Sequence, residues 1–586
     1  MVDVFVLRQL GVRDMVTLNC RMADERQGIT DAINVSQSSQ CTDLVGFQVG
    51  PCHLFSSRWH SGSDLSAERT SIPRDIMSLA IILFALTLAA FIARVVYRCY
   101  FHPLARYPGP WFAHISNAWR LVAFFSGQHH LMEQRLHARY GRVVRVAPNW
   151  LSFSTLEDFE AIYGFNKAIE KDEFYDFGRD RGSRPESIFA AKTETSHRVK
   201  KKKVVSPALT STRITSYKPI IDKHVGILLT RLPSQSKGPL PEAKNNGTTA
   251  VNMAPIVHQC TLDAMLELVF GPRLSEHPYS DTPAGEGVCS NLRIMTKMAW
   301  SFSLWPAFGW LMNTRPVNAM LRRPTYSKQG ELTGMAGLMG VAMPRLLRNP
   351  QQVVASSQPS IVKGWLEVPP DDATRMTPAE VASEASNLII AGPGSTAAAL
   401  TAVIFYLGTK DGQGWQERIR EQIRASQSHD LGPSSLELQA VIKETLRLSA
   451  PFPTAFPRVI RPGAEMAIPS LAAPLPVGTT VSANTFVLGR SRELWGNDAD
   501  RWEPRRWLGS EQHRREMETK FVAFSKGSRS CIGRELALLL LAQAVIGIVQ
   551  QWKFRSRGQL QGKSFLEMQY DECWIKFEPL DLSLSA

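Results

Sequence analysis

The stretch "FSKGSRSCIGRE", residues 524–535, places a single thiol among glycines and cations, immediately before a strongly apolar run. The pattern predicts a loop that enters a helix just after Cys531. Exposed N–H groups and the positive end of the helix dipole at that point favour a thiolate over a thiol. Such a sulfur is either a metal ligand or a nucleophile.

The neighbours of this thiol indicate a bulky, acidic binding partner. Gly527 and Gly533 leave space for a broad group to approach the backbone, and Arg529 offers a fixed cation to an acidic group. A nucleophilic cysteine needs a histidine base, and no histidine lies near Cys531 in the sequence. A histidine that the fold brings close remains an alternative.

The loop resembles a known haem-binding motif. Five residues match the pattern Phe-x-x-Gly-x-Arg-x-Cys-x-Gly of the cytochrome P-450 monooxygenases at every fixed position: Phe524, Gly527, Arg529, Cys531 and Gly533. This resemblance implies that Cys531 is the axial thiolate ligand of the iron in haem b, a ligand that favours O–O cleavage. The alternative is a buried structural cysteine beside turn glycines, and five matched positions count against it.

Two further segments resemble the same family. In "KETLR", Glu444 and Arg447 lie three residues apart, on one face of a predicted helix. In "DRWEPRRWL", Arg506 follows Pro504, with tryptophan at 502 where the family usually has phenylalanine. The resemblance implies a buried triad of Glu444, Arg447 and Arg506 that braces the haem loop and is structural rather than catalytic. A solvated ion pair is the alternative for the first two.

Two cations are expected near the acidic edge of the haem. Arg458 falls where the family commonly has a cation for a haem propionate, and its alternative is a surface arginine. In "HRVKKKKVV", His197 and Lys201 occupy the positions of the family's Trp-x-x-x-Arg, which gives Lys201 a propionate as its expected partner. The other lysines of this run predict a basic face for an acidic reductase, or else a solvated helix face: Lys200, Lys202 and Lys203.

The segment "NLIIAGPGSTAAAL", residues 387–400, resembles the family's oxygen-activating helix. Pro393 cannot donate to the carbonyl of Ile389, so the helix is expected to open there, and two helices joined by a turn are the alternative. The hydroxyls of Ser395 and Thr396 are the candidates for organising proton delivery. Gly394 stands where the family has an acidic residue. Either water and hydroxyls deliver the protons, or the chemistry depends less on them.

The elements that must position these residues are mainly helical. Apolar residues recur every three or four positions in windows such as "LELQAVIKETLRL", whereas strand-like runs such as "GTTVSANTFVLG" are shorter. We expect a mainly α structure with small β-sheets, and the resemblance implies the cytochrome P-450 fold over residues 111–586. The apolar run from Leu536 to Val549 is too short to span a membrane and predicts a buried helix.

Residues 76–93 carry no charge and reach about the minimum length for crossing a bilayer core of ~30 Å. We predict a single transmembrane anchor at 76–98 and a proline-rich link at 99–110. Arginines that follow the span place the body on the cytoplasmic side. A cleaved signal peptide is the alternative.

Residues 1–75 are polar and predict an N-terminal extension. We expect the native protein to start at Met77 and the residues before it to come from an over-extended gene model. If the extension is present, Asn34 in "NVS" is a luminal glycosylation candidate.

Composition and net charge bear on the kind of partner that the protein binds. The 586 residues are 44% hydrophobic and 20% charged, as in a globular protein, and the net charge of +14 suits an acidic partner, an anionic membrane or nucleic acid. No nucleic-acid-binding signature accompanies that charge, so we expect no nucleic-acid partner. The eight cysteines lack the paired spacing of a disulfide scaffold or a zinc site.

Together the residues and the resemblance predict a monooxygenase anchored in the endoplasmic reticulum, with its catalytic domain in the cytosol. It would oxidise a small apolar organic substrate with O2 and electrons from NADPH, delivered by cytochrome P-450 reductase. The segments from His102 onward resemble filamentous-fungal microsomal members, many of which tailor secondary metabolites. A family member that rearranges or dehydrates its substrate without reductase, and a non-catalytic membrane haem protein, are the alternatives.

Overall fold

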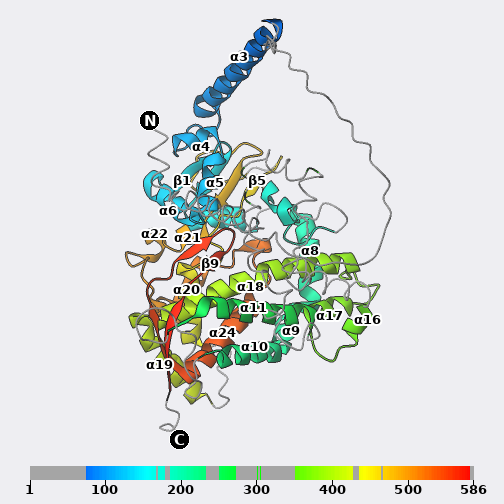
Figure 1. The fold of residues 1–586 in the computed structure, drawn as a ribbon, viewed down its shortest axis with the longest axis vertical. Coiled ribbons are helices and arrows are strands. Elements are labelled where there is room, and N and C mark those ends of the chain that lie inside the picture. Colours follow the sequence, from blue (N-terminus) through cyan, green and yellow to red (C-terminus); the bar gives the residue numbers. More distant parts are fainter. Residues whose placement is uncertain are drawn as a thin grey trace, which may run out of the picture. The chain divides into compact units, whose positions relative to one another are not determined.

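The computed structural model of the protein describes residues 74–165, 169–178, 185–232, 250–271, 300, 304, 314, 350–426, 435–462 and 466–580. The expected extension, apart from its last two residues, and the glycosylation candidate Asn34 lie outside the described residues. Residues 80–586 form one compact unit of helices and small sheets (Figure 1). This architecture confirms the predicted fold class.

Helices dominate the described chain. In the first half they are α3 (Arg74–Val96), the π-helical turn η1 (Tyr97–Phe101), α4 (Trp111–Ile115), α5 (Ala118–Phe125), α6 (His129–Tyr140), α7 (Leu156–Tyr163), η2 (Glu173–Gly178), α8 (Glu194–Ala208), α9 (Ser211–Ser216), α10 (Lys218–Thr230) and α11 (Met253–Phe270). In the second half they are α16 (Pro350–Val354), α17 (Ile361–Leu366), α18 (Pro378–Gly408), α19 (Lys410–Ala425), α20 (Leu436–Leu448), α21 (Thr485–Leu488), α22 (Arg492–Trp495), η6 (Pro504–Trp507), α23 (Glu511–Lys520), η7 (Gly527–Arg529) and α24 (Arg534–Gln551).

Ten described strands form small sheets: β1 (Val143–Ala147), β2 (Trp150–Phe153), β3 (Ile169–Lys171), β4 (Ala250–Asn252), β5 (Arg458–Ile460), β6 (Thr480–Ala483), β7 (Trp552–Arg557), β8 (Gly562–Ser564), β9 (Met568–Tyr570) and β10 (Trp574–Pro579). The largest sheet has the order β1-β2-β6-β5-β3, in which only β2 and β6 are parallel. The others are β4-β10-β7 and the hairpin β8-β9.

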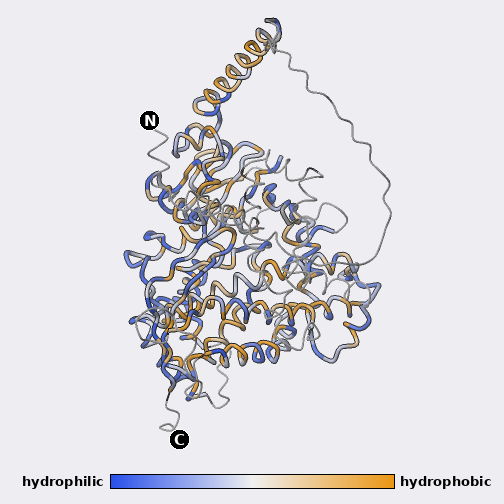
Figure 2. Tube along the Cα trace, viewed as in Figure 1, coloured by the Kyte–Doolittle hydropathy of each residue, from blue (hydrophilic) through white to orange (hydrophobic). Residues whose placement is uncertain are grey.

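Helix α18 is the central element of the core. Thr377 caps its start: the Thr377 hydroxyl accepts from the Glu380 N–H, and the Glu380 carboxylate accepts from the Thr377 N–H. The helix packs mainly against α11 (Figure 1), and both carry apolar residues along their length (Figure 2). α24 is buried, as its short apolar run predicts, because its side chains pack into the same core.

Helix α3 differs from the two buried apolar helices. Met77–Phe101, α18 and α24 are each long and apolar enough to cross a membrane, but most of α18 and α24 is buried in the protein, whereas none of Met77–Phe101 is. Met77–Phe101 is therefore the candidate span. Helical structure continues to Phe101, beyond the predicted end at residue 98, and stops at His102, which the following proline restricts to an extended conformation.

Candidate functional site

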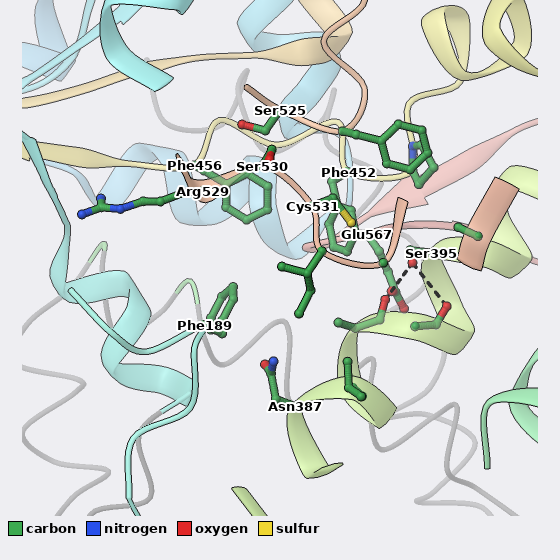
Figure 3. A pocket seen from close by; sticks show the side chains of 18 of the residues that line it. Phe189, Asn387, Ser395, Phe452, Phe456, Ser525, Arg529, Ser530, Cys531 and Glu567 are labelled. Atoms are coloured by element: carbon green, nitrogen blue, oxygen red, sulfur yellow. Dashed lines mark hydrogen bonds between the residues drawn. The ribbon is translucent and has the colours of Figure 1, made fainter. Parts of the chain in front are cut away.

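A cavity of about 650 Å3 lies between α18, the cysteine loop, β5 and the β8-β9 hairpin. Most of its lining surface is apolar, although many polar side chains also border it. Figure 3 shows Cys531, Ser395 and Glu567 facing this space, together with Asn387 and Arg529. Most of the residues that the sequence singled out meet here, although they come from segments far apart in the chain.

The cysteine loop has the predicted form. The Cys531 N–H donates to the Phe524 carbonyl at 2.9 Å, which closes the loop, and α24 begins three residues after the cysteine, at Arg534. Within the described residues, Cys531 alone among the free cysteines lines the cavity; Cys99, Cys260 and Cys573 lie elsewhere.

The protein acts on the pKa of the Cys531 thiol in two directions. Desolvation by the surrounding protein raises the pKa, whereas the neighbouring backbone N–H groups and the charges of Arg534 and Lys201 lower it, and the net direction is upward. The side chain itself is open to the cavity. A cation bound in the cavity, such as a metal ion, would favour the thiolate.

Gly527 keeps the loop against the neighbouring helix end. Its φ of +71° is left-handed, and a Cβ there would overlap the backbone of Tyr163 and Gly164. We expect Gly527→Ala to lower the free energy of unfolding by about 1–3 kcal/mol, the range for a residue forced into a strained backbone conformation.

Thermal unfolding of the detergent-solubilised protein measures this loss. Gly414→Ala is the matched control, because Gly414 lies within α19 with no atom near its potential Cβ. That substitution should hold or raise stability, since alanine is the better helix former. Equal melting temperatures for the two variants would contradict the assigned role of Gly527.

Cations gather at one end of the cavity. Arg458 is 5% exposed and stacks on Tyr163 and Tyr175. Arg529 donates to the Lys192 carbonyl at 3.0 Å and pairs with Glu194 at 3.2 Å. Burial, followed by the charge of Arg458, lowers the pKa of Arg529 to about 10. Both arginines line the cavity.

Lys171 is a cation of this cluster that the sequence did not reveal. It stands directly opposite Arg458 in the β3-β5 pair, an arrangement of like charges that is normally destabilising. Its ammonium donates to the carbonyls of Ile188 and Phe189, and burial followed by the arginines' charges lowers its pKa well below the usual value. The Nε2 atom of His197, which also lines the cavity, is buried without a hydrogen-bond partner.

These groups fit the acidic edge of a haem. Three cations and an unpartnered imidazole nitrogen meet at one end of the cavity, where Glu194 pairs with Arg529 and Glu384 acts on Lys171. An anionic group bound there would relieve the repulsion. Lys201 is placed differently: its ammonium donates to the Ser528 carbonyl at 2.8 Å, and it is absent from the cavity lining. Lys201 therefore contacts the backbone of the cysteine loop, whereas His197 and Lys171 line the cavity.

Glu384 is a buried carboxyl beside this end. It is 3% exposed, and it accepts a hydrogen bond from the Ile188 N–H at 2.7 Å. Burial raises its pKa from 4.5 to about 7. Because the folded protein holds this proton more tightly than the unfolded chain does, the stabilisation is complete below about pH 4.5 and is lost as the pH rises through 7.

We therefore expect the free energy of unfolding to fall by up to about 3 kcal/mol from this group between pH 4.5 and 7. Thermal unfolding across this range should give a steeper decline for the native protein than for Glu384→Gln, which does not titrate. Parallel curves for the two proteins would contradict the assignment.

Helix α18 carries the predicted hydroxyls. It is one continuous helix through Pro393, so the alternative of two helices joined by a turn is wrong. The opening expected at Pro393 does not interrupt the helix. The Ser395 hydroxyl donates to the Ala391 carbonyl at 2.7 Å and to the Gly392 carbonyl at 3.3 Å, bonds drawn in Figure 3. Ser395 and the buried Thr396 both line the cavity, as the sequence predicts.

The structural triad is present. Glu444 is fully buried, and its carboxylate accepts from Arg447 Nε at 2.8 Å and Nη2 at 2.7 Å, and from Arg506 Nε at 3.3 Å. The alternative of a solvated pair is thus wrong. An aromatic chain runs from Trp507, which donates to Glu444, through Phe521 to Phe524 of the cysteine loop. The triad is thereby linked to the cavity wall.

Comparison with known proteins agrees with this geometry. The family model described as Cytochrome P450 matches residues 107–569. Cytochrome P450 monooxygenase AKT7 of Alternaria alternata is 27% identical over 501 residues, which cover 82% of this chain and 90% of that protein. Pisatin demethylase of Fusarium vanettenii is 26% identical over 506 residues, with coverages of 83% and 89%.

A third relative is longer than this chain. Cytochrome P450 monooxygenase mpaDE of Penicillium roqueforti is 26% identical over 479 residues, which cover 79% of this chain but only 53% of that protein. The chain thus spans about half of that relative. The relatives named here are fungal, as the segments after His102 predict. Because the family model matches most of the length of this chain, the chain belongs to the cytochrome P450 family.

Proposed function

We propose that the protein is a membrane-anchored haem-thiolate monooxygenase. It inserts one oxygen atom of O2 into a small apolar organic molecule, by hydroxylation or a related oxidation, with electrons from NADPH delivered by cytochrome P-450 reductase. The observation that carries the proposal is the cavity in which the Cys531 thiol, the α18 hydroxyls and a cluster of cations meet. When bound, haem b supplies the oxygen activation and the oxidation itself.

The residues of the chain hold and shield this cofactor. Cys531 would ligate the iron through its sulfur, and the positive metal would favour the thiolate that burial disfavours. Arg458, Arg529, Lys171 and His197 would hold the acidic propionates. A Cβ at Gly533 would meet only the Cys531 sulfur, 4.0 Å away, so the backbone there admits a broad group.

The cavity lining supports an apolar substrate. Phe189, Phe452 and Phe456 border the space (Figure 3), and Asn387 is a polar side chain on the same helix as Ser395. Apolar walls exclude water and bind a substrate by burial, while a few polar groups orient it. The relatives of this chain include a fungal cytochrome P450 monooxygenase and a fungal demethylase. We therefore propose a role in the secondary metabolism of a fungus.

The membrane and the reductase complete the proposal. The exposed apolar surface of Met77–Phe101 supports anchoring in the endoplasmic reticulum, with the body in the cytosol. The proposed basic face for the reductase is reduced to Lys200 and Lys202, because the Lys203 ammonium pairs with Glu380 at 3.1 Å. Reversing the charges at 200 and 202 should slow reductase-supported turnover more at low salt than at high salt.

Expression of the full chain in reductase-containing microsomes tests the function. We expect a thiolate-type reduced carbon-monoxide spectrum, NADPH-dependent O2 uptake, and an oxidised metabolite in a host that carries the gene but not in one that lacks it. A protein without the thiolate-type spectrum would overturn the haem-thiolate assignment. Turnover that persists without NADPH would favour the reductase-independent rearrangement instead.

A further inference from the structure

Glu567 is a buried carboxyl group that faces the cavity beside α18. It is 4% exposed and lies in the turn between β8 and β9. Among the described residues that line the cavity, it is the only acidic one. Figure 3 shows its side chain directed toward the part of α18 that carries Ser395. The cavity thus has cations at one end and a single lining carboxylate beside the hydroxyls.

The backbone around Glu567 is fixed on both sides. The Leu566 carbonyl accepts from the Thr454 hydroxyl at 3.1 Å, and the Met568 N–H donates to the Pro451 carbonyl at 2.7 Å. Both neighbours of Glu567 are buried. These bonds fix the backbone from which the Glu567 side chain extends into the cavity, at the hairpin turn and against the segment after α20.

Gly394 and Glu567 share one space. A Cβ placed on Gly394 would overlap the Cδ and Oε1 atoms of Glu567 and lie 2.6 Å from Oε2. The backbone of Gly394 does not have a positive φ, so its conformation does not require glycine, and glycine within a helix is unfavourable by about 1 kcal/mol relative to alanine. The carboxyl group of the hairpin occupies the volume that a side chain at position 394 would take.

The Ser395 hydroxyl lies on the same part of α18 as Gly394. Its O–H bond is directed to the carbonyls of Ala391 and Gly392, so the lone pairs of Oγ are available to accept a hydrogen bond. To pass a proton to a group in the cavity, the hydroxyl accepts one proton on a lone pair and turns its original O–H bond away from these carbonyls. A water molecule between the Glu567 carboxyl group and the bound group can serve in the same way.

We propose that Glu567 is the proton-donating residue of the reaction, supplying from the hairpin the carboxyl group that α18 lacks at Gly394. This inference rests on the proposed function. For each C–H bond that becomes C–OH, O2 receives two electrons from NADPH through the reductase and two protons, and one of its atoms leaves as water. The Glu567 O–H bond breaks as each proton passes to Ser395 or a water molecule, and the carboxylate regains a proton from solvent.

Glu567→Gln tests the proposal, because it preserves shape and removes the acid. The first readout is the infrared C–O stretching frequency of carbon monoxide bound to the reduced protein, which responds to nearby charges and proton donors. We expect this frequency to shift in Glu567→Gln. Glu572→Gln is the matched control, because Glu572 follows the same hairpin but is exposed, with its carboxylate accepting from Trp574. It should leave the frequency unchanged.

The second readout is the fraction of the consumed O2 that is released as hydrogen peroxide in the presence of reductase and NADPH. Loss of the acid should slow the step that releases water by on the order of 10²-fold, the lower end for a positioned general acid. The peroxide fraction then rises, because O2 that keeps its O–O bond after taking up two electrons and two protons leaves as hydrogen peroxide. The double variant Gly394→Glu/Glu567→Gly moves the carboxyl group onto α18 and should lower the peroxide fraction toward the native value.

The outcomes separate the two proposals. A native protein without a thiolate-type spectrum overturns the proposed function. If the native protein has that spectrum, but the C–O frequency and the peroxide fraction are both unchanged in Glu567→Gln, only the role of Glu567 is overturned. A double variant that retains the thiolate-type spectrum but releases as much hydrogen peroxide per O2 as Glu567→Gln would also overturn it, since a carboxyl group would then be present without effect.

Discussion

Replacing Cys531 with alanine should abolish the thiolate-type reduced carbon-monoxide spectrum and reduce NADPH-dependent turnover to the level of membranes without the protein. The sulfur lines the cavity next to Arg529 and Ser530, and no other described cysteine does. The loop itself should survive, because the bond that closes it joins the backbone N–H of residue 531 to the Phe524 carbonyl and involves no side chain. The expected loss is therefore one of ligation rather than of folding.

Two measurements distinguish these causes. The melting temperature of the haem-free Cys531→Ala protein should stay close to that of the haem-free native protein, whereas the absorbance of bound haem should fall or change type. Cys99→Ala is the control, since Cys99 lies in the helical turn at Tyr97–Phe101 and is absent from the cavity lining. It should keep the native spectrum. A thiolate-type spectrum in Cys531→Ala would contradict the central assignment.

Local sequence patterns predicted the parts of the site that lie within single segments. The cysteine loop and the start of α24 follow from glycine spacing and an apolar run, and the Glu444–Arg447 pair follows from its spacing on one helix. Each of these features depends on residues that lie close together in the sequence. A pattern of types and spacing is sufficient for such features.

The parts assembled from distant segments were not predictable in this way. Lys171 reaches the cavity because β3 pairs with β5, nearly three hundred residues later in the chain. Glu567 reaches α18 because its hairpin is held against Thr454 and Pro451. The glycine at 394 was the available signal for Glu567, since a glycine within a helix can mark the close approach of another group. The sequence alone does not say which group approaches.

Electrostatic effects at two positions depend on how the chain packs. The helix start beside Cys531 suggested a stabilised thiolate, but desolvation by the surrounding protein has the larger effect on the pKa of the thiol. The resemblance gave Lys201 a propionate as its expected partner, yet its ammonium is directed to the Ser528 carbonyl. Burial and side-chain direction depend on packing, which local patterns do not determine.

Glu444→Gln should give the largest loss of stability among the substitutions that leave the cavity lining unchanged. Among the described residues, Glu444 supplies the only carboxylate that pairs directly with the buried Arg447. The other partners of Arg447 are the carbonyls of Gly489, Ala499 and Arg501. Removing one member of a buried ion pair is expected to destabilise by about 3–5 kcal/mol, because the remaining charge stays buried without compensation.

The effect should extend to the haem loop. Glu444 also accepts from the Trp507 indole N–H at 2.9 Å, and Trp507 contacts Phe521, which contacts Phe524. Loosening this chain should speed the loss of haem, even though no triad residue is part of the cavity lining. Thermal unfolding and the rate of haem transfer to an acceptor protein measure the two effects separately.

A double substitution and a surface control make the result specific. In Glu444→Gln/Arg447→Met the unpaired charge is gone, so the double variant should be more stable than Glu444→Gln alone. Glu511→Gln breaks an exposed pair with Arg515, whose side chains are 69% and 78% exposed, and should change stability by less than about 1 kcal/mol. If Glu444→Gln is no more destabilising than Glu511→Gln, the triad does not brace the loop. If the double variant instead loses the sum of its single losses, the cost comes from lost contacts rather than from an uncompensated charge.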